Sequence, residues 1–165
     1  MKKLSLLLLL TFLCLGSIQA QSELTTFILV RHAEKANDDP RDPTLSIDGE
    51  VRAEMLAQLL ADQEITAIYS TPFKRTRDTA KPLAQMKRLE VEIYDFRSST
   101  YLQDMLKAHK GGTVLISGHS NTTPMIANTL LGEEKFKTLD ENEYGKIFII
   151  SVSEIGEGKV TMVRY

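Results

Sequence analysis

The 165-residue sequence contains a single cysteine, no tryptophan and only three histidines. The cysteine, Cys14, falls in the first 20 residues, so the remainder of the chain has no thiol that could form a disulfide or bind a metal. The sequence also lacks internal repeats and low-complexity tracts, which excludes repeat, fibrous and disordered architectures. What remains is the composition of an ordinary globular chain, with 42% hydrophobic and 25% charged residues.

Neither sign of charge predominates in the sequence. The 20 Lys and Arg residues are set against 22 Asp and Glu residues, which gives a formal net charge of −2. This balance gives no support to a nucleic acid or an anionic membrane as the main partner. The length fits one domain of common size, so we expect the function to come from a local group of side chains.

The N-terminal residues have the features of a secretory signal peptide. Two lysines precede an apolar run from Leu4 to Leu15, and a small residue, Ala20, stands at the predicted cleavage position. The run is shorter than the roughly 20 residues that a transmembrane helix needs. We therefore predict a signal peptide over residues 1–20 and one exported domain over residues 21–165, periplasmic or secreted and without stable membrane association. Retention of the segment as an uncleaved anchor is the alternative.

Along the rest of the chain, short apolar runs alternate with amphipathic stretches. The pattern predicts helical faces formed by two sets of residues, Val51, Met55, Leu56, Leu59 and Leu60, and then Leu102, Met105 and Leu106. The pairs Thr71–Pro72 and Thr123–Pro124 are typical of helix starts. Strands are predicted at residues 27–30, 67–69, 91–94, 114–116, 145–153 and 159–165, the last two as a closing hairpin. This alternation predicts an α/β layer fold with a mostly parallel sheet.

Cationic and imidazole side chains follow three of these strands. Arg31 and His32 come directly after the first strand, Arg75 lies one turn beyond the second, and His119 follows the fourth. Because parallel strands deliver their carboxyl ends to one edge of a sheet, we expect these four residues to lie together. The third histidine, His109, stands beside glycines in a predicted loop, and we expect it to be exposed and inert.

The residues at these positions resemble the histidine phosphatase superfamily, in its phosphoglycerate mutase-like branch. The resemblance spans residues 25–165 and implies a three-layer α/β/α sandwich. Ala33, where most members have glycine, and Ser120, where the acid-phosphatase branch has aspartate, depart from the pattern. The resemblance is carried by Val30, Arg31, His32 and Glu34, by Leu45, Ser46 and Gly49, by Tyr69, Ser70, Thr71, Pro72, Arg75, Thr79 and Ala80, and by Val114 to Ile116 leading into Gly118, His119 and Ser120.

The resemblance implies roles that suit phosphoryl transfer. His32 would be the nucleophile, and the charge of the neighbouring arginines would lower its pKa and keep it neutral. A phosphoryl group spreads negative charge over its oxygens, which guanidinium groups bind in a forked manner. Arg31, Arg75 and a protonated His119 would therefore bind the phosphoryl group. Ser70 and the amides near Ser120 would add neutral donors.

The proton donor for the leaving group is less evident from the sequence. Members that act on alcohols place a glutamate soon after the third strand, where this sequence has Asp95 without the usual surroundings. Glu34, next to the nucleophile segment, is a second candidate. No metal-ligand spacing occurs among the histidines and carboxylates, so we expect neither a metal nor another cofactor.

The function predicted from the sequence is metal-independent hydrolysis of a phosphate monoester through a phosphohistidine intermediate. The substrate would be a small phosphorylated metabolite or a phosphohistidine, since a phosphorylated imidazole leaves without strong acid assistance. Phosphoryl transfer of the mutase type and a non-catalytic phosphate-binding or partner-binding domain are the alternatives. A serine-hydrolase elbow centred on Ser120 is disfavoured because no histidine follows that serine.

Overall fold

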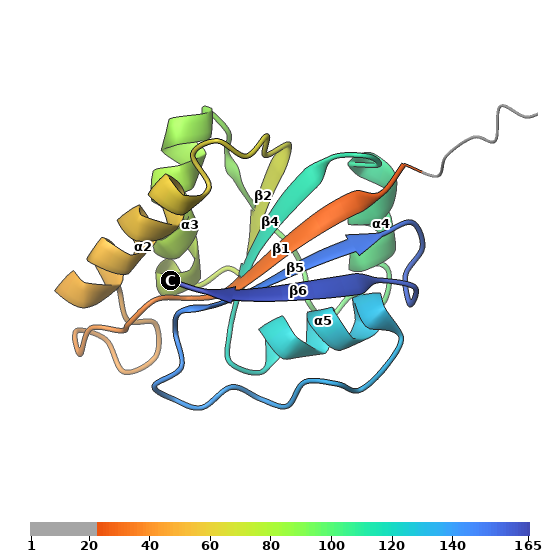
Figure 1. The fold of residues 1–165 in the computed structure, drawn as a ribbon. Helices are drawn as coiled ribbons and strands as arrows, with labels where there is room; N and C mark the ends of the chain where they lie inside the picture. The colour runs from red at the N-terminus through yellow and green to blue at the C-terminus, as the bar shows by residue number, and fades with distance from the viewer. Residues whose placement is uncertain (1–22) are drawn as a thin grey trace, which may run out of the picture.

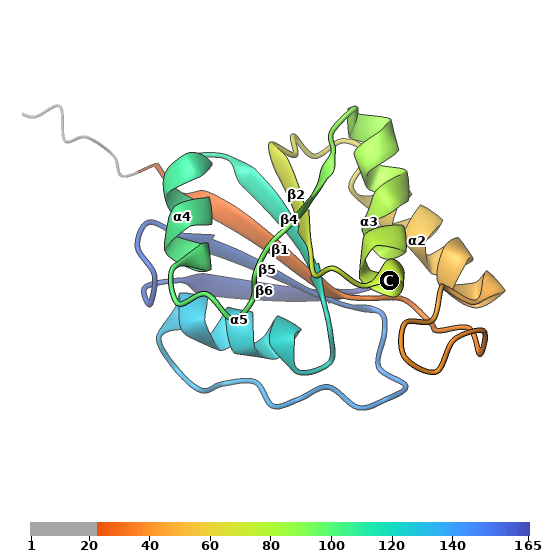
Figure 2. The same ribbon diagram turned by 180° about the vertical axis from the view of Figure 1, so that it is seen from behind.

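The computed structural model describes residues 23–165, so the expected signal peptide, residues 1–20, lies outside the described residues. A six-stranded sheet with strand order β3-β2-β4-β1-β5-β6 forms the centre of the fold. Helices α2 and α3 cover one face of this sheet and α4 and α5 the other (Figures 1 and 2). The strands are β1 (Thr25–Arg31), β2 (Ala67–Ser70), β3 (Val91–Ile93), β4 (Thr113–Gly118), β5 (Lys146–Val152) and β6 (Lys159–Arg164), and the helices are α2 (Ile47–Leu59), α3 (Lys74–Lys87), α4 (Tyr101–Ala108) and α5 (Thr122–Leu131).

The predicted α/β/α sandwich with a mostly parallel sheet is confirmed. Strands β3, β2, β4 and β1 pair in parallel, whereas β5 and β6 form the expected hairpin and pair antiparallel. The register places Arg31 of β1 beside Gly118 of β4, and Ser70 of β2 beside Ser117 of β4. Three strands therefore deliver their following segments to the same edge of the sheet. No helix within residues 23–165 combines the length and apolarity needed to cross a membrane.

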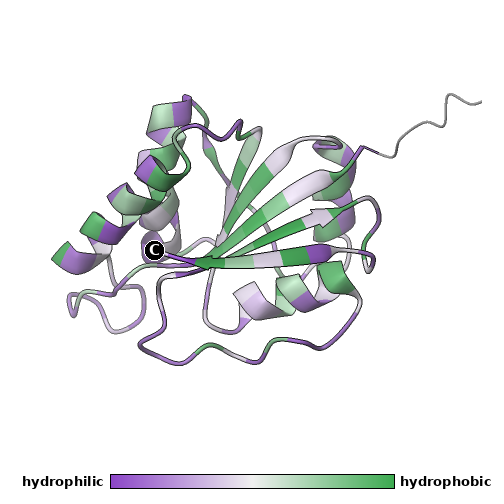
Figure 3. Ribbon diagram, in the orientation of Figure 1, coloured by the Kyte–Doolittle hydropathy of each residue, from purple (hydrophilic) through white to green (hydrophobic). Residues whose placement is uncertain are grey.

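Strand β1 shows why the sheet is covered on both faces. Its residues Phe27, Ile28, Leu29 and Val30 are all buried, as the continuous apolar run requires for a central strand (Figure 3). Successive side chains point to opposite faces. Phe27 and Leu29 thus join the core beneath α4 and α5, and Ile28 and Val30 join the core beneath α2 and α3. The sheet separates two hydrophobic cores and forms a rigid platform for its edge.

The face of α2 that packs on the protein differs from the predicted one. Leu56 is buried, but Val51, Met55 and Leu59 are about half exposed. The buried stripe is made mostly of small residues, because the first turn of α2 lies against the segment that follows β1. A Cβ atom on Gly49 would stand 2.3 Å from the carbonyl oxygen of Glu34. Glycine and alanine allow this close approach, and the larger apolar side chains are turned outward.

Neither Thr-Pro pair begins its helix in the predicted manner. Helix α3 begins at Lys74, two residues after Pro72, and the Lys74 amide donates to the carboxylate of Asp42 at 2.9 Å. The cap is thus supplied by the distant loop at residues 37–46. Helix α5 begins at Thr122, so Pro124 occupies its third position. The start of α2 is conventional, with the Ser46 hydroxyl accepting the amide of Gly49.

Candidate active site

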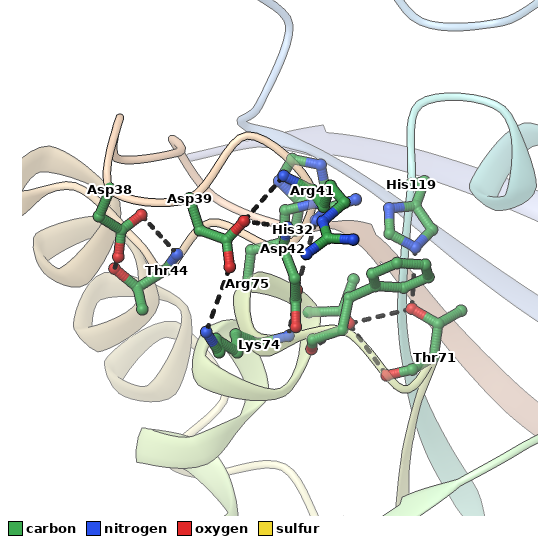
Figure 4. Close-up of polar contacts among 12 residues, drawn as sticks. His32, Asp38, Asp39, Arg41, Asp42, Thr44, Thr71, Lys74, Arg75 and His119 are labelled. Carbon is green, nitrogen blue, oxygen red and sulfur yellow. Dashed lines mark hydrogen bonds and ion pairs between the residues drawn. The ribbon is translucent and has the colours of Figure 1, made fainter.

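The sheet edge brings Arg31, His32, Arg75 and His119 together. Figure 4 shows His32, Arg75 and His119 of this group. The ring centroids of His32 and His119 are 5.5 Å apart. Both arginines are close enough for their charge to lower the pKa of both histidines. The sequence-based expectation that these four residues share one location therefore holds in the structure.

His32 is buried, and one of its two ring nitrogens is already engaged. Its Nδ1 lies 2.8 Å from the carbonyl oxygen of Ala33. In the neutral ring Nδ1–H donates to that carbonyl and Nε2 keeps its lone pair. The Ala33 amide in turn donates to the hydroxyl of Thr79 on α3, at 2.9 Å, which fixes this segment to the helix. The position and tautomer of the imidazole are thus determined by the backbone around it.

Burial is the main cause of the low pKa of His32. The pKa is lowered from 6.5 to about 3 by burial and, to a smaller extent, by the charges of Arg31, His119 and Arg75, while the hydrogen bond with the Ala33 carbonyl opposes this shift. The prediction that arginine charge depresses this pKa is correct in direction, but desolvation contributes more. At neutral pH the nitrogen that faces away from Ala33 therefore carries no proton.

His119 is held by a hydroxyl group and an aromatic ring. Its Nε2 lies 2.9 Å from Oγ1 of Thr71, and the Phe73 ring meets it edge-on at 5.0 Å between centroids. Its main-chain amide donates to the Thr122 hydroxyl at the start of α5, at 2.8 Å. Burial, followed by the charges of Arg75 and Arg31, lowers the pKa of His119 to about 4, and the charge of Asp42 opposes this shift. Without a bound anion both imidazoles are neutral at pH 7.

Arg31 is buried, and one end of its guanidinium is used to hold a loop. Nη1 donates to three carbonyl oxygens of the segment after α5, those of Asp140 at 2.7 Å, Glu141 at 3.0 Å and Glu143 at 3.2 Å. The guanidinium also lies over the Tyr144 ring, 4.3 Å from its centroid. Its Nε is buried and has no hydrogen-bond partner among the described residues. Nε and Nη2 are the atoms left for a ligand.

Arg75 presents more unsatisfied donors than Arg31. Its Nη1 lies 3.6 Å from the Asp42 carboxylate, too far for a hydrogen bond, and its guanidinium stacks on Phe73 at 4.7 Å from the ring centroid. Within residues 23–165, neither Nε nor Nη1 of Arg75 has a hydrogen-bond partner. A buried donor without a partner is costly. An oxyanion between the two arginines would satisfy these groups.

The two serines differ in their relation to the site. Ser70 is fully buried, and its hydroxyl donates to the carbonyl of Thr71 at 2.9 Å, so it is already used within its own turn. Ser120 is half-buried and follows His119 directly. Its carbonyl accepts the amide of Leu139 at 2.9 Å, which ties the segment before Asp140 to the start of α5.

Neither predicted proton donor has its carboxylate engaged at the site. Both oxygens of Glu34 accept hydrogen bonds from Arg52 on α2, at 2.6 to 2.9 Å. Burial raises the pKa of Glu34, but the bonds with Arg52 outweigh it and the net pKa lies below the usual value. Asp95 is exposed, and its carboxylate accepts the amide of Arg97 in a local turn. Glu34 is thus a structural ion-pair partner, and Asp95 stabilises a turn.

His109 also differs from its prediction, because it is half-buried and its Nε2 lies 2.8 Å from the Tyr69 hydroxyl. Several residues around the site were not foreseen. Main-chain carbonyls that surround an arginine leave no signature in a sequence. The unforeseen residues are Asp42, Thr71 as a partner of His119, Phe73, Glu141 and Tyr144.

The four site residues lie apart from a hollow between α2 and α3. This hollow, of about 1140 Å³, is lined by residues such as Val51, Met55 and Pro82. None of the four site residues lines it. A phosphoryl group is small and needs donors more than enclosed volume. In the described part of the chain, no three His, Cys, Asp or Glu side chains are grouped as metal ligands.

Comparisons with known proteins show similarity over the part of the chain that contains Arg31, His32 and Arg75. A model of the histidine phosphatase superfamily (branch 1) matches residues 27–96. Phosphoserine phosphatase 1 of Hydrogenobacter thermophilus is 47% identical over 70 residues, which cover 39% of this chain and 33% of that protein. The matched part thus spans about a third of the length of this relative. Over residues 27–96 the chain is therefore similar to the histidine phosphatase superfamily (branch 1).

Solved structures extend the likeness to most of the fold. The putative phosphohistidine phosphatase SixA of Agrobacterium tumefaciens superimposes with a TM-score of 0.64 at 21% identity, over 86% of this chain and 98% of that one. The protein histidine phosphatase SixA complexed with tungstate gives 0.68 at 19% identity, over 84% and 96%. A phosphoserine phosphatase mutant of Entamoeba histolytica in complex with phosphoserine gives 0.64 at 19% identity, over 83% and 95%. At these identities the likeness concerns the fold.

Proposed function

We propose that this protein is a metal-independent phosphatase that hydrolyses a small phosphorylated metabolite or a phosphohistidine through a phosphohistidine formed on His32. The observation that carries the proposal is the unpaired state of the buried guanidinium donors of Arg31 and Arg75 beside two neutral imidazoles. A dianionic phosphoryl group supplies the acceptors that these donors lack. The signal-peptide features of residues 1–20 support a periplasmic or secreted location for this activity.

In the first step Nε2 of His32 attacks phosphorus while the bond from phosphorus to the leaving group breaks, at an oxygen in a phosphate monoester and at a ring nitrogen in a phosphohistidine. Nδ1 stays hydrogen-bonded to Ala33, whose carbonyl stabilises the positive charge that develops on the ring. In the second step water attacks phosphorus, the N–P bond breaks and inorganic phosphate leaves. Arg31 and Arg75 bind the equatorial oxygens in both steps, because charge on these oxygens is present throughout the transfer.

His119 has a complementary role. Its pKa of about 4 keeps the ring neutral in the free enzyme. A bound dianion favours the protonated ring, which then donates one N–H to Thr71 and the other to a phosphoryl oxygen. Substrate binding therefore recruits a third cation to the site. The leaving group determines how much further assistance the reaction needs.

The proposal is tested with His32→Ala and, as a matched control, His109→Ala, which removes a histidine outside the site. We expect His32→Ala to lower p-nitrophenyl phosphate turnover by at least about 10³, since nucleophile loss removes the covalent route. Mass spectrometry at alkaline pH should detect a phosphorylated peptide containing His32 only in proteins that retain this residue. Residual activity above about a tenth of wild type would overturn the nucleophile assignment, and inhibition by excess EDTA would indicate a metal mechanism instead.

A further inference from the structure

The proposed hydrolysis leaves one chemical requirement without a residue. A leaving alkoxide is a strong base, so its departure needs a proton, and a positioned general acid typically accelerates such a step by about 10² to 10⁴. The carboxylates of Glu34 and Asp95 are engaged elsewhere, with Arg52 and with a local turn. A donor must therefore be sought among the carboxylates that contact the phosphate-binding arginines.

Two carboxylates in the described part of the chain form ion pairs with those arginines. Asp42 lies 3.6 Å from Nη1 of Arg75, and its carboxylate also accepts the first amide of α3, from Lys74, at 2.9 Å. That bond commits Oδ1 of Asp42 to the start of α3 and fixes its place in the fold. Asp42 is therefore a positioning residue for Arg75.

Glu141 has the opposite character. Its Oε2 lies 3.6 Å from Nη2 of Arg31 and 3.6 Å from Nζ of Lys35, and the side chain is 76% exposed. Both separations exceed hydrogen-bond length, so the carboxylate is held near the site only by charge and is free to rotate. Its backbone is fixed, however, because the Glu141 carbonyl accepts Nη1 of Arg31 at 3.0 Å. The side chain is thus tethered at the site and mobile within it.

The burial of His32 indicates the side on which the leaving group departs. An in-line attack by Nε2 of the buried His32 expels the leaving oxygen away from the protein interior, towards solvent. The segment that carries Glu141 and Tyr144 contacts Arg31, and the Tyr144 and His32 ring centroids are 6.1 Å apart. Of the two carboxylates that pair with the phosphate-binding arginines, Glu141 is the more exposed, with a side-chain exposure of 76% against 31% for Asp42.

We propose that Glu141 is the general acid and base for the hydrolysis of alkyl phosphates at this site, an inference that rests on the function proposed above. As the Nε2–P bond forms and the P–O bond breaks, the Glu141 carboxyl group gives its proton to the leaving oxygen, which departs as an alcohol. In the second step the Glu141 carboxylate takes a proton from the attacking water while the N–P bond breaks. Phosphate is released, and Glu141 is again protonated.

In the free protein the Glu141 carboxylate lies between two cations, Arg31 and Lys35. A phosphoryl group bound to Arg31 takes the place of this carboxylate as the counter-ion of the guanidinium. The Glu141 side chain is then available to the leaving group.

The test compares substrates whose leaving groups differ in their need for a proton. β-Glycerophosphate releases an alkoxide, whereas p-nitrophenyl phosphate releases a phenolate that is stable as an anion. We expect Glu141→Gln to lower kcat/KM for β-glycerophosphate by about 10² and for p-nitrophenyl phosphate by less than about threefold. Across substituted phenyl phosphates, kcat/KM should fall more steeply with leaving-group basicity in Glu141→Gln than in the wild type, and Glu141→Asp should restore part of the loss.

Two control variants remove carboxylates that should take no part in this proton transfer. Glu134→Gln changes an exposed side chain of the same connecting segment, and Asp95→Asn removes the acid expected from the sequence. Both should leave the ratio of the two substrates unchanged. A selective loss below tenfold in Glu141→Gln, or a tenfold selective loss in Asp95→Asn, would overturn the assignment. Failure of the proposed function has a different signature, because neither substrate would then be hydrolysed by the wild type or both would survive His32→Ala.

Discussion

The first and last parts of the domain contribute to the site in different ways. Residues 27–96, which match the family model, supply Arg31, His32 and Arg75, side chains with specific chemistry in a fixed sequence context. Beyond residue 96, His119 is the one side chain that the sequence marks, and the segment around Asp140 contributes main-chain carbonyls that bind Arg31. The first part thus contributes three of the four central side chains, and the last part adds His119 and the carbonyl groups that hold Arg31 in place. Mutations in the two parts should therefore fail differently.

The largest effect in this comparison is expected for Arg75→Lys, a substitution within residues 27–96. Lysine keeps the positive charge but has no planar fork with which to bind two phosphoryl oxygens and stack on Phe73. We expect kcat/KM for p-nitrophenyl phosphate to fall by about 10² to 10³, as for loss of an oxyanion-hole donor, with little change in the urea midpoint. Arg77→Lys, at an exposed position of the same helix, is the control. A loss below tenfold would show that Arg75 acts only as a charge.

A substitution that removes core packing beside the segment around Asp140 should lower both stability and activity. Leu139 is buried in the core beneath α4 and α5, and its amide donates a hydrogen bond to the Ser120 carbonyl. It directly precedes Asp140, the first of the residues whose carbonyls bind Arg31. We expect Leu139→Ala to cost about 2 to 4 kcal/mol in the free energy of unfolding and about tenfold in kcat/KM. Urea denaturation and kinetics at a temperature where the variant is fully folded measure the two effects.

Leu102→Ala is the matched control for this experiment. Leu102 is buried in the same core but belongs to α4 and lies outside the segment that contacts Arg31. It should lose similar stability and retain kcat/KM within about twofold. Equal losses of activity in the two variants would mean that the segment around Asp140 has no special role in positioning Arg31.

The sequence was sufficient to predict the strands and the four central residues because these depend on strong local signals. Short apolar runs identify buried strands, and parallel strands necessarily bring the residues after them to one edge. His32 and His119 could therefore be placed together although 86 residues separate them.

Other features depend on tertiary contacts and have no local signal. The buried face of α2 is decided by the close approach of Gly49 to the backbone of Glu34, which overrides the more apolar ridge through Val51 and Met55. Helix α3 takes its N-terminal cap from Asp42, 32 positions away. The hydrogen bonds that bind Arg31 come from carbonyls that every residue possesses. For this reason Glu34 and Asp95 were plausible acids in the sequence, and only the fold directed attention to Glu141.

The smallest expected effect is on the pH dependence of folding stability, to which His32 and His119 both contribute. Their folded-state pKa values, about 3 and about 4, lie below the usual 6.5. Between those values and pH 6.5 the unfolded chain binds more protons than the folded one, so stability decreases as pH falls. Each pH unit in this window costs up to about 1.4 kcal/mol per histidine.

Replacement of either histidine by asparagine should therefore make the protein less sensitive to acid. Relative to wild type, His32→Asn and His119→Asn should gain about 2 kcal/mol on going from pH 7.5 to pH 5, measured by urea denaturation in buffers without phosphate. Below pH 4 the gains should diverge, because His119 becomes protonated in the folded state while His32 is still neutral, and only His32→Asn should continue to gain. Identical profiles down to pH 3 would mean that the two rings are equally desolvated, which would contradict the deeper burial of His32.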